Sequence, residues 1–146
     1  ALIVRLQSGA TPRRAVVGWD SGRLAMLLAV LEARCGLGFS TAEVYLNVAG
    51  GYRLSDPAAD AAVAAALVSA LADRPLPADA VWLGEIALSG ELRPAAHAAL
   101  RLKEAAKLGF GAAVAPLAGQ VSAPAGLRLV PLAGVAALVD RVMASP

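Results

Sequence analysis

The chain has 146 residues, of which 58% are hydrophobic, and a formal net charge of +2 at pH 7. This length fits one domain, and the apolar content is ample for one core. No apolar run approaches the roughly 20 residues that a membrane-spanning helix needs, and the first residues show no signal-peptide pattern. We therefore expect a single domain, without a membrane partner, that works in the cytoplasm.

The residues that metal and nucleotide chemistry use are scarce. The chain has one cysteine, Cys35, and one histidine, His97, which argues against a zinc site. We expect Cys35 to be a structural thiol on the apolar face of a helix, and His97 to be a surface or helix-capping residue. The sequence contains no Walker A phosphate loop and no GxSxG or HExxH motif. We therefore expect no metal, no cofactor and no nucleotide hydrolysis in this chain.

In the first third of the chain, alternation of apolar and polar residues predicts three strands, over residues 1–7, 13–19 and 43–48. Gly9 and Pro12 lie between the first two strands and are typical of a hairpin turn. Apolar residues at helical spacing predict a helix that begins at Asp20 or Ser21 and ends at Gly36.

A second helix is predicted to begin at Asp56 and Pro57. Its heavier apolar stripe consists of Val63, Leu67 and Leu71. After a polar break comes the unit over residues 84–110, around which we expect the rest of the chain to be organised. It reads as a strand, a tight turn and a helix that ends at Gly109, with the helical apolar pattern Leu100, Leu102, Ala105, Ala106 and Leu108.

The last third of the chain is predicted to hold two more strands and one helix. The strands fall near residues 112–115 and 127–132, separated by a loop rich in Gly, Pro and Ser, and the helix covers about residues 134–143. Strands and helices thus alternate without a low-complexity linker. This order predicts an α+β domain with mixed sheets and packed helices.

Three motifs in fixed order carry a resemblance to a known family: NVAGGYRLSDPAADAAVAAALVS, GEIALSGELRP and RLKEAAKLGF. Together they resemble the proteolytic domain of Lon. With the upstream segment PRRAVVGWDSGRLAMLLAVLEARCGLGF, they are more similar to the C-terminal domain of the bacterial RadA (Sms) family. The resemblance covers nearly the whole chain, residues 1–146. It implies a Lon proteolytic-domain-like fold, of the ribosomal protein S5 domain 2 type, within a larger protein.

The resemblance also implies that the domain is not a peptidase. Lon uses a serine nucleophile and a lysine base, and the matching positions here are Ala58 and Ala99. Lys103 lies one helical turn beyond Ala99, but a displaced base cannot act without a nucleophile. Asp60 moreover replaces a glycine, which would put a negative charge where an oxyanion has to form. No residue of this chain is therefore expected to be catalytic.

What the resemblance implies instead is a part in DNA repair. RadA-type proteins are hexameric recombination ATPases with an N-terminal zinc finger and a RecA-like motor, associated with branch migration alongside RecA and with the response to DNA damage. The family therefore implies DNA, further copies of the same chain and RecA as partners. The expected tasks of the present domain are to contact DNA and to hold the ring together.

The candidate DNA-binding residues are basic: Arg13, Arg14, Arg93, Arg101, Lys103 and Lys107. Eleven of the thirteen basic residues in the chain are arginine, which suits bidentate phosphate contacts. The aromatic residues are dispersed, so duplex backbone contact is favoured over stacking of single strands. The alternative for the two lysines, which are four residues apart, is an ordinary solvated helix face.

A second reading makes the domain an oligomerisation scaffold without direct DNA contact. It rests on charged residues in turns and at helix starts, whose short spacings suit either internal pairing or a ring interface: Asp20, Arg23, Arg53, Asp56, Asp60, Glu85, Glu91 and Arg93.

Overall fold

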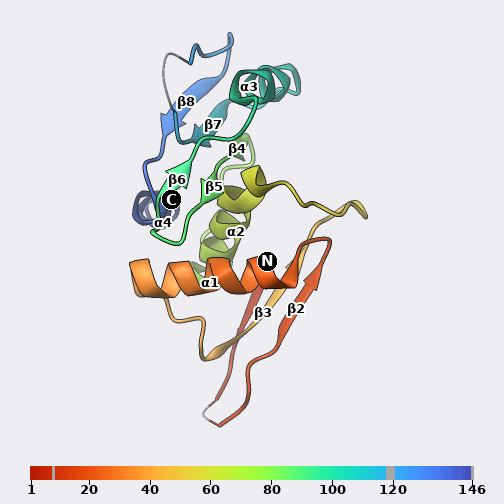
Figure 1. The fold of residues 1–146 in the computed structure, drawn as a ribbon, viewed down its shortest axis with the longest axis vertical. Coiled ribbons are helices and arrows are strands. Elements are labelled where there is room, and N and C mark those ends of the chain that lie inside the picture. Colours follow the sequence, from red (N-terminus) through yellow and green to blue (C-terminus); the bar gives the residue numbers. More distant parts are fainter. Residues whose placement is uncertain (8, 118–120, 146) are drawn as a thin grey trace.

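The computed structural model describes residues 1–7, 9–117 and 121–145. Over these residues the chain forms an α+β fold with four α-helices, one 3-10 turn and three sheets that include parallel and antiparallel pairs. The predicted α+β class with mixed sheets is therefore confirmed. Figure 1 shows the N-terminal sheet and α1 at one end of the long axis, and α3 with the C-terminal sheet at the other. None of the helices in the described ranges has the length and apolar content needed to cross a membrane.

The N-terminal sheet consists of β1 (Leu2–Arg5), β3 (Ala42–Asn47) and β2 (Arg14–Val17), in that spatial order. β1 runs antiparallel to β3, whereas β2 runs parallel to it. The expected hairpin between the first two strands is therefore wrong. The reason is that α1 connects β2 to β3 as a crossover, so these two strands are parallel neighbours. β1 therefore pairs with the other side of β3 and not with β2.

Helix α1 (Ser21–Cys35) begins and ends where its capping residues predict. The Asp20 side chain accepts a hydrogen bond from the backbone N–H of Arg23 at 2.8 Å. Gly36 ends the helix in the left-handed conformation at φ 67°. The helix buries the predicted apolar face over the N-terminal sheet and α2; its buried residues are Leu24, Leu27, Leu28, Val30 and Leu31.

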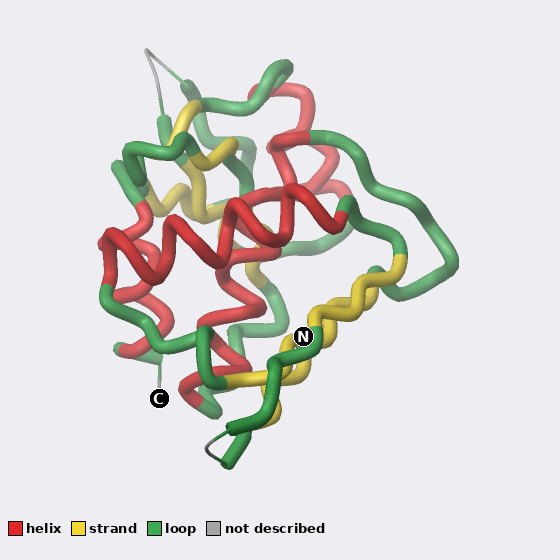
Figure 2. Tube along the Cα trace, turned by 60° about the horizontal axis from the view of Figure 1, so that its bottom comes forward, coloured by secondary structure: helices red, strands yellow, loops and turns green. Residues whose placement is uncertain are grey.

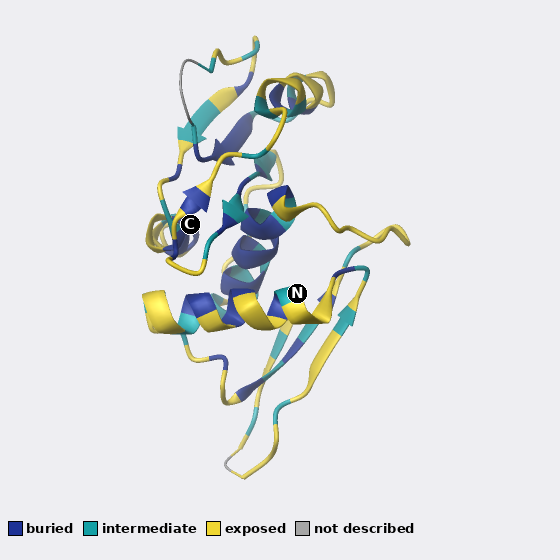
Figure 3. Cartoon of the chain, in the orientation of Figure 1, coloured by how far each residue is buried: buried dark blue, intermediate teal, exposed yellow. Residues whose placement is uncertain are grey.

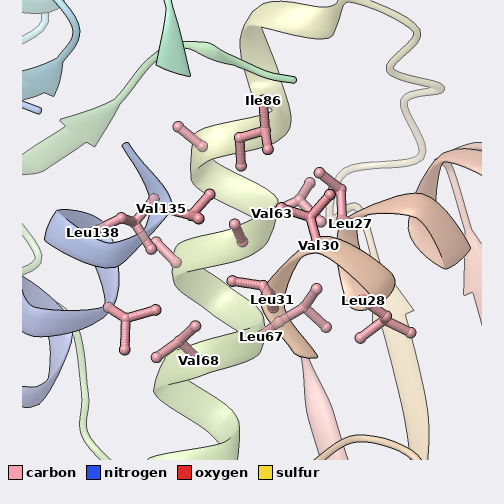
Figure 4. Packing of buried hydrophobic residues seen from close by; sticks show 14 of the residues in the cluster. Leu27, Leu28, Val30, Leu31, Val63, Leu67, Val68, Ile86, Val135 and Leu138 are labelled. Carbon is pink, nitrogen blue, oxygen red and sulfur yellow. The ribbon is translucent and has the colours of Figure 1, made fainter. Parts of the chain in front are cut away.

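Helix α2 (Asp60–Ala72) follows a 3-10 turn, η1 (Pro57–Ala59), and is the element around which the others pack. It lies between α1 and α4, and Figure 4 shows side chains of both neighbours meeting it. The expectation that residues 84–110 organise the fold is therefore wrong. The small alanine side chains of α2 let neighbouring elements pack closely on several of its sides, so more of the helix is buried than the predicted apolar stripe. Its buried residues are Asp60, Ala61, Val63, Ala64, Ala65, Leu67 and Val68.

The segment 84–110 forms a small hairpin and a peripheral helix. β5 (Glu85–Ile86) pairs antiparallel with β6 (Leu92–Arg93), and α3 (Ala98–Lys107) ends before Gly109 as predicted. The predicted apolar face of this helix is only partly correct, because Leu100 and Leu108 are 68% and 67% exposed. Helix α3 covers one side of a small sheet, so only a narrow stripe is buried (Figure 3).

The C-terminal sheet is parallel, with β7 (Ala112–Ala115) between β4 (Ala80–Trp82) and β8 (Arg128–Pro131). β7, β8 and α4 (Val135–Met143) confirm predicted elements, whereas β4 was not predicted. Its three residues are too few to show a clear alternation. Helix α4 packs on α2, as the close view in Figure 4 shows, and the tube in Figure 2 shows helices lying between two groups of strands.

Candidate nucleic-acid interface

The structure separates the six predicted DNA-binding residues into distinct groups. Arg13 and Arg14 lie at the start of β2 in the N-terminal sheet, which is far from α3 along the long axis of the molecule (Figure 1). Arg93 lies on β6, where its Cα partner across the hairpin is Glu85. The other three residues share α3. Only the α3 group therefore concentrates positive charge on one element.

The two basic residues at β2 differ in what they contact. The guanidinium of Arg14 donates to the carbonyl of Ala42 and, at 2.9 Å, to that of Phe39. These contacts tie the start of β2 to the first residue of β3 and to the loop before it, which is a structural task. For Arg13, only its backbone carbonyl takes part in a hydrogen bond within the described ranges, as an acceptor from Val44.

On α3, Lys103 and Lys107 are exposed, and among the described residues neither makes an ion pair. They lie one helical turn apart and so face the same side of the helix. Glu104 is exposed as well and reduces the positive charge of the surface. We call the exposed side of α3 that carries Lys103 and Lys107 the α3 basic face.

Arg101 lies on the same helix but is held by two contacts. Its Nη2 donates to Oδ2 of Asp56 at 2.6 Å, and its Nε donates to the carbonyl oxygen of Ala96 at 2.8 Å. The side chains of Arg101 and Asp56 are 33% and 47% exposed, so water surrounds much of the pair. The contact joins the start of α3 to the segment that precedes α2.

Asp56 is engaged on both of its carboxylate oxygens. Oδ1 accepts the backbone N–H of Ala58 at 3.0 Å and so caps η1, while Oδ2 accepts Arg101. The Ala58 N–H and then the Arg101 guanidinium lower the pKa of Asp56 below its usual value. Short spacing suggested Arg53 as the partner of Asp56, but the actual partner lies 45 residues away.

The position expected from the sequence to match the Lon nucleophile, Ala58, is buried. Ala58 is 4% exposed within η1. Its carbonyl accepts the N–H of Gly84 at 2.9 Å, and the carbonyl of Gly84 accepts the N–H of Ala61 at 3.0 Å. These two bonds hold the start of α2 against Gly84, the first residue of the GEIALSGELRP motif, so the structure brings two of the three motifs together.

The position expected from the sequence to match the Lon base, Ala99, is exposed. Ala99 lies in the first turn of α3 and lines a hollow of about 410 Å³ together with Lys103 and Pro124. His97, just before the helix, is exposed as expected. It occupies the N-cap position with a left-handed backbone, at φ 56°, but its side chain makes no capping hydrogen bond.

Asp60 is the one charged residue classed as buried within the described ranges. Its carboxylate is bound by the guanidinium of Arg23 through both Nε and Nη2, and it accepts the backbone N–H of Ile86 at 3.0 Å. The hydrogen bond to Asp60 raises the pKa of Arg23 above its usual value. We call this arrangement the Arg23–Asp60 clasp, which joins α1, α2 and β5.

The clasp changes the expected electrostatics around Ala58. The sequence suggested that Asp60 places an open negative charge near the missing nucleophile. In the structure this charge is neutralised by Arg23, with Glu85 4.0 Å from the same guanidinium. Sequence spacing missed the pair because Arg23 and Asp60 are 37 residues apart. Within the described residues, no group of three or more metal-ligating side chains is found.

The fold and the site together define an α+β segment that is held by two arginine–aspartate pairs. Arg23–Asp60 ties α1 to the start of α2, and Arg101–Asp56 ties α3 to the start of η1. No protein-family model matches the chain, but curated proteins named DNA repair protein RadA do. The chain is 58% identical to that of Brucella abortus (strain 2308) over 144 residues, which are 98% of this chain and 31% of that protein.

Two further relatives carry the same name. The RadA of Rickettsia felis is 57% identical over 100 residues, which are 68% of this chain and 22% of that protein. The RadA of Mycolicibacterium smegmatis is 48% identical over 129 residues, which are 88% of this chain and 28% of that protein. The chain is therefore homologous to a segment of RadA proteins and spans less than a third of the length of these relatives. The resemblance to the RadA family is thereby confirmed.

Proposed function

We propose that the chain is the Lon-like C-terminal domain of a RadA-type protein, that it is not proteolytic, and that it binds duplex DNA and supports a hexameric ring. The name of the relatives, DNA repair protein RadA, supports a role in DNA repair and recombination. By the family resemblance, the whole protein is a cytoplasmic, DNA-dependent ATPase with RecA as a further partner. The observation that carries the DNA-binding part is the α3 basic face, where Lys103 and Lys107 are exposed and make no ion pair among the described residues.

The Lon-like fold over residues 1–146 is supported by the contact between motifs. A Ser-Lys active site would need the start of α2 and the segment after the GEIALSGELRP motif to lie close together. Here the start of α2 is bonded to Gly84, and Arg101 of α3 is bonded to Asp56 just before η1. The contacts between these segments therefore support a fold like that of the Lon proteolytic domain.

We expect no peptidase activity from this chain, even with Ala58→Ser and Ala99→Lys combined. Ala58 is almost fully buried, so a hydroxyl placed there would be out of reach of a substrate. A lysine at the exposed position of Ala99 would stay in water and keep its ordinary affinity for protons. Release of fluorescent fragments from labelled casein measures the activity. Faster release by the double variant than by the unchanged chain would contradict this prediction.

DNA binding through the α3 basic face is expected to depend steeply on salt, because each neutralised phosphate releases counterions. We expect the variant Lys103→Ala/Lys107→Ala to bind duplexes of all sequences less tightly, by about the same factor. Two lost phosphate contacts would reduce the slope of log affinity against log salt by about two. Fluorescence anisotropy of labelled duplex and single-stranded DNA at several salt concentrations measures both quantities.

A control variant removes the same charge elsewhere. Arg5→Ala/Arg53→Ala takes away two exposed positive charges outside α3, and we expect it to leave the salt slope nearly unchanged. If the unchanged and folded chain does not bind duplex at low salt, the DNA-binding role is wrong. The remaining candidate would then be the oligomerisation scaffold without DNA contact, for which light scattering distinguishes a monomer from a hexamer.

A further inference from the structure

The contact between Arg101 and Asp56 resembles the contact that the Arg101 guanidinium would make with a phosphate. A guanidinium binds carboxylate and phosphate oxygens through the same charge-assisted hydrogen bonds. Here Nη2 of Arg101 donates to Oδ2 of Asp56 at 2.6 Å. The arginine nearest the α3 basic face in sequence is therefore bound to an acidic group of the same chain.

The rest of the Arg101 side chain is held independently of Asp56. Its Nε donates to the carbonyl of Ala96 at 2.8 Å, two residues before the helix begins. If the carboxylate leaves, this second contact keeps the guanidinium in place. Arg101 would then present its free donors on the helix that also carries Lys103 and Lys107, but on a different side, because it is two and six residues from them.

The pair is also weak enough to be opened by DNA. Both side chains are substantially exposed, at 33% and 47%, and exposed ion pairs contribute little net stability. A duplex offers many closely spaced phosphates and gains free energy from counterion release. Asp56 keeps a role when the pair opens, because its Oδ1 still caps η1 at Ala58.

We infer that Asp56 competes with DNA phosphates for Arg101, so that the Asp56–Arg101 pair holds the duplex affinity of α3 below the value that the cations of this helix alone would set. This inference rests on the DNA binding proposed above. It makes Asp56 a residue that sets affinity without contacting DNA, and it makes Arg101 a phosphate ligand only when the pair is open.

The test is a double-mutant cycle of Asp56→Asn and Arg101→Ala, measured by anisotropy with a labelled duplex. Asparagine keeps an oxygen that can cap η1 but removes the carboxylate that binds Arg101. We expect Asp56→Asn to tighten duplex binding about two- to fivefold, the range that an exposed ion pair allows. One further phosphate contact should also make the salt slope steeper by about one.

The Arg101→Ala background separates competition from a simple change of net charge. Glu104→Gln serves as the matched control, because it removes an exposed negative charge from α3 without any ion pair among the described residues. In the Arg101→Ala background, the gain from Asp56→Asn should fall to no more than the gain from Glu104→Gln. Thermal unfolding of each variant shows that it is folded.

The outcomes distinguish this inference from the function on which it rests. If the unchanged chain does not bind duplex, the proposed DNA binding fails and the inference falls with it. If the chain binds but Asp56→Asn binds no tighter, or gains equally with and without Arg101, DNA binding stands and competition by Asp56 is wrong.

Discussion

Replacement of Arg23 by alanine is expected to lower the free energy of unfolding by about 3 kcal/mol, because it leaves a buried charge without its partner. Asp60 is fully buried and would keep only the hydrogen bond from the N–H of Ile86. The partial exposure of Arg23, 26% of its side chain, places the effect near the lower end of the range for buried pairs. Urea unfolding followed by the fluorescence of the buried Trp19 and Trp82 measures it.

Two further variants show whether the clasp causes the loss. Arg34→Ala removes another arginine of α1, whose guanidinium makes only 3.3 Å contacts with the carbonyl of Leu88, and should cost less than about 1 kcal/mol. Arg23→Met combined with Asp60→Leu removes both charges and should recover part of the stability, because the buried N–H of Ile86 still loses its acceptor. An Arg23→Ala variant as stable as Arg34→Ala would show that the clasp contributes little.

Truncation of Leu67 to alanine is expected to destabilise the chain by about 3 kcal/mol, through lost apolar burial and the cavity left behind. Leu67 is 0% exposed on α2, where it faces α1 in the packed cluster of Figure 4. Neighbours on several sides of α2 limit how far the site can collapse. The same urea titration gives the free energy of unfolding.

The matched control is Leu100→Ala on α3, which makes the same chemical change at a 68% exposed position. We expect a change within about 0.5 kcal/mol. Equal losses for the two leucines would contradict the assignment of α2 as the central helix and of α3 as peripheral. The comparison matters because the sequence placed both leucines on apolar helical stripes.

The elements that could be predicted are those whose signals are local. Asp20 and Gly36 mark the ends of α1 because capping acts within one turn of the helix. The burial pattern of β3 alternates along Ala42–Asn47 because successive side chains of a strand point to opposite faces. β4 was missed because three residues after a polar break give too short a pattern.

The candidate site was only partly predictable for a related reason. The sequence singled out Lys103, Lys107 and Arg101 as neighbours because they share one helix. It could not show that Arg101 is bound to Asp56, since that contact depends on how α3 meets η1. Nor could it show that Arg13 and Arg14 lie in a different sheet from the one that α3 covers.

The sequence by itself determined the α+β class, most helix and strand positions and the likeness to RadA proteins. The tertiary structure alone decided the strand order of the N-terminal sheet, the central place of α2, the exposure of α3, and the two arginine–aspartate pairs. Periodicity and capping act over a few residues, whereas these pairs join positions 37 and 45 residues apart. Such contacts form only once packing has brought distant segments together.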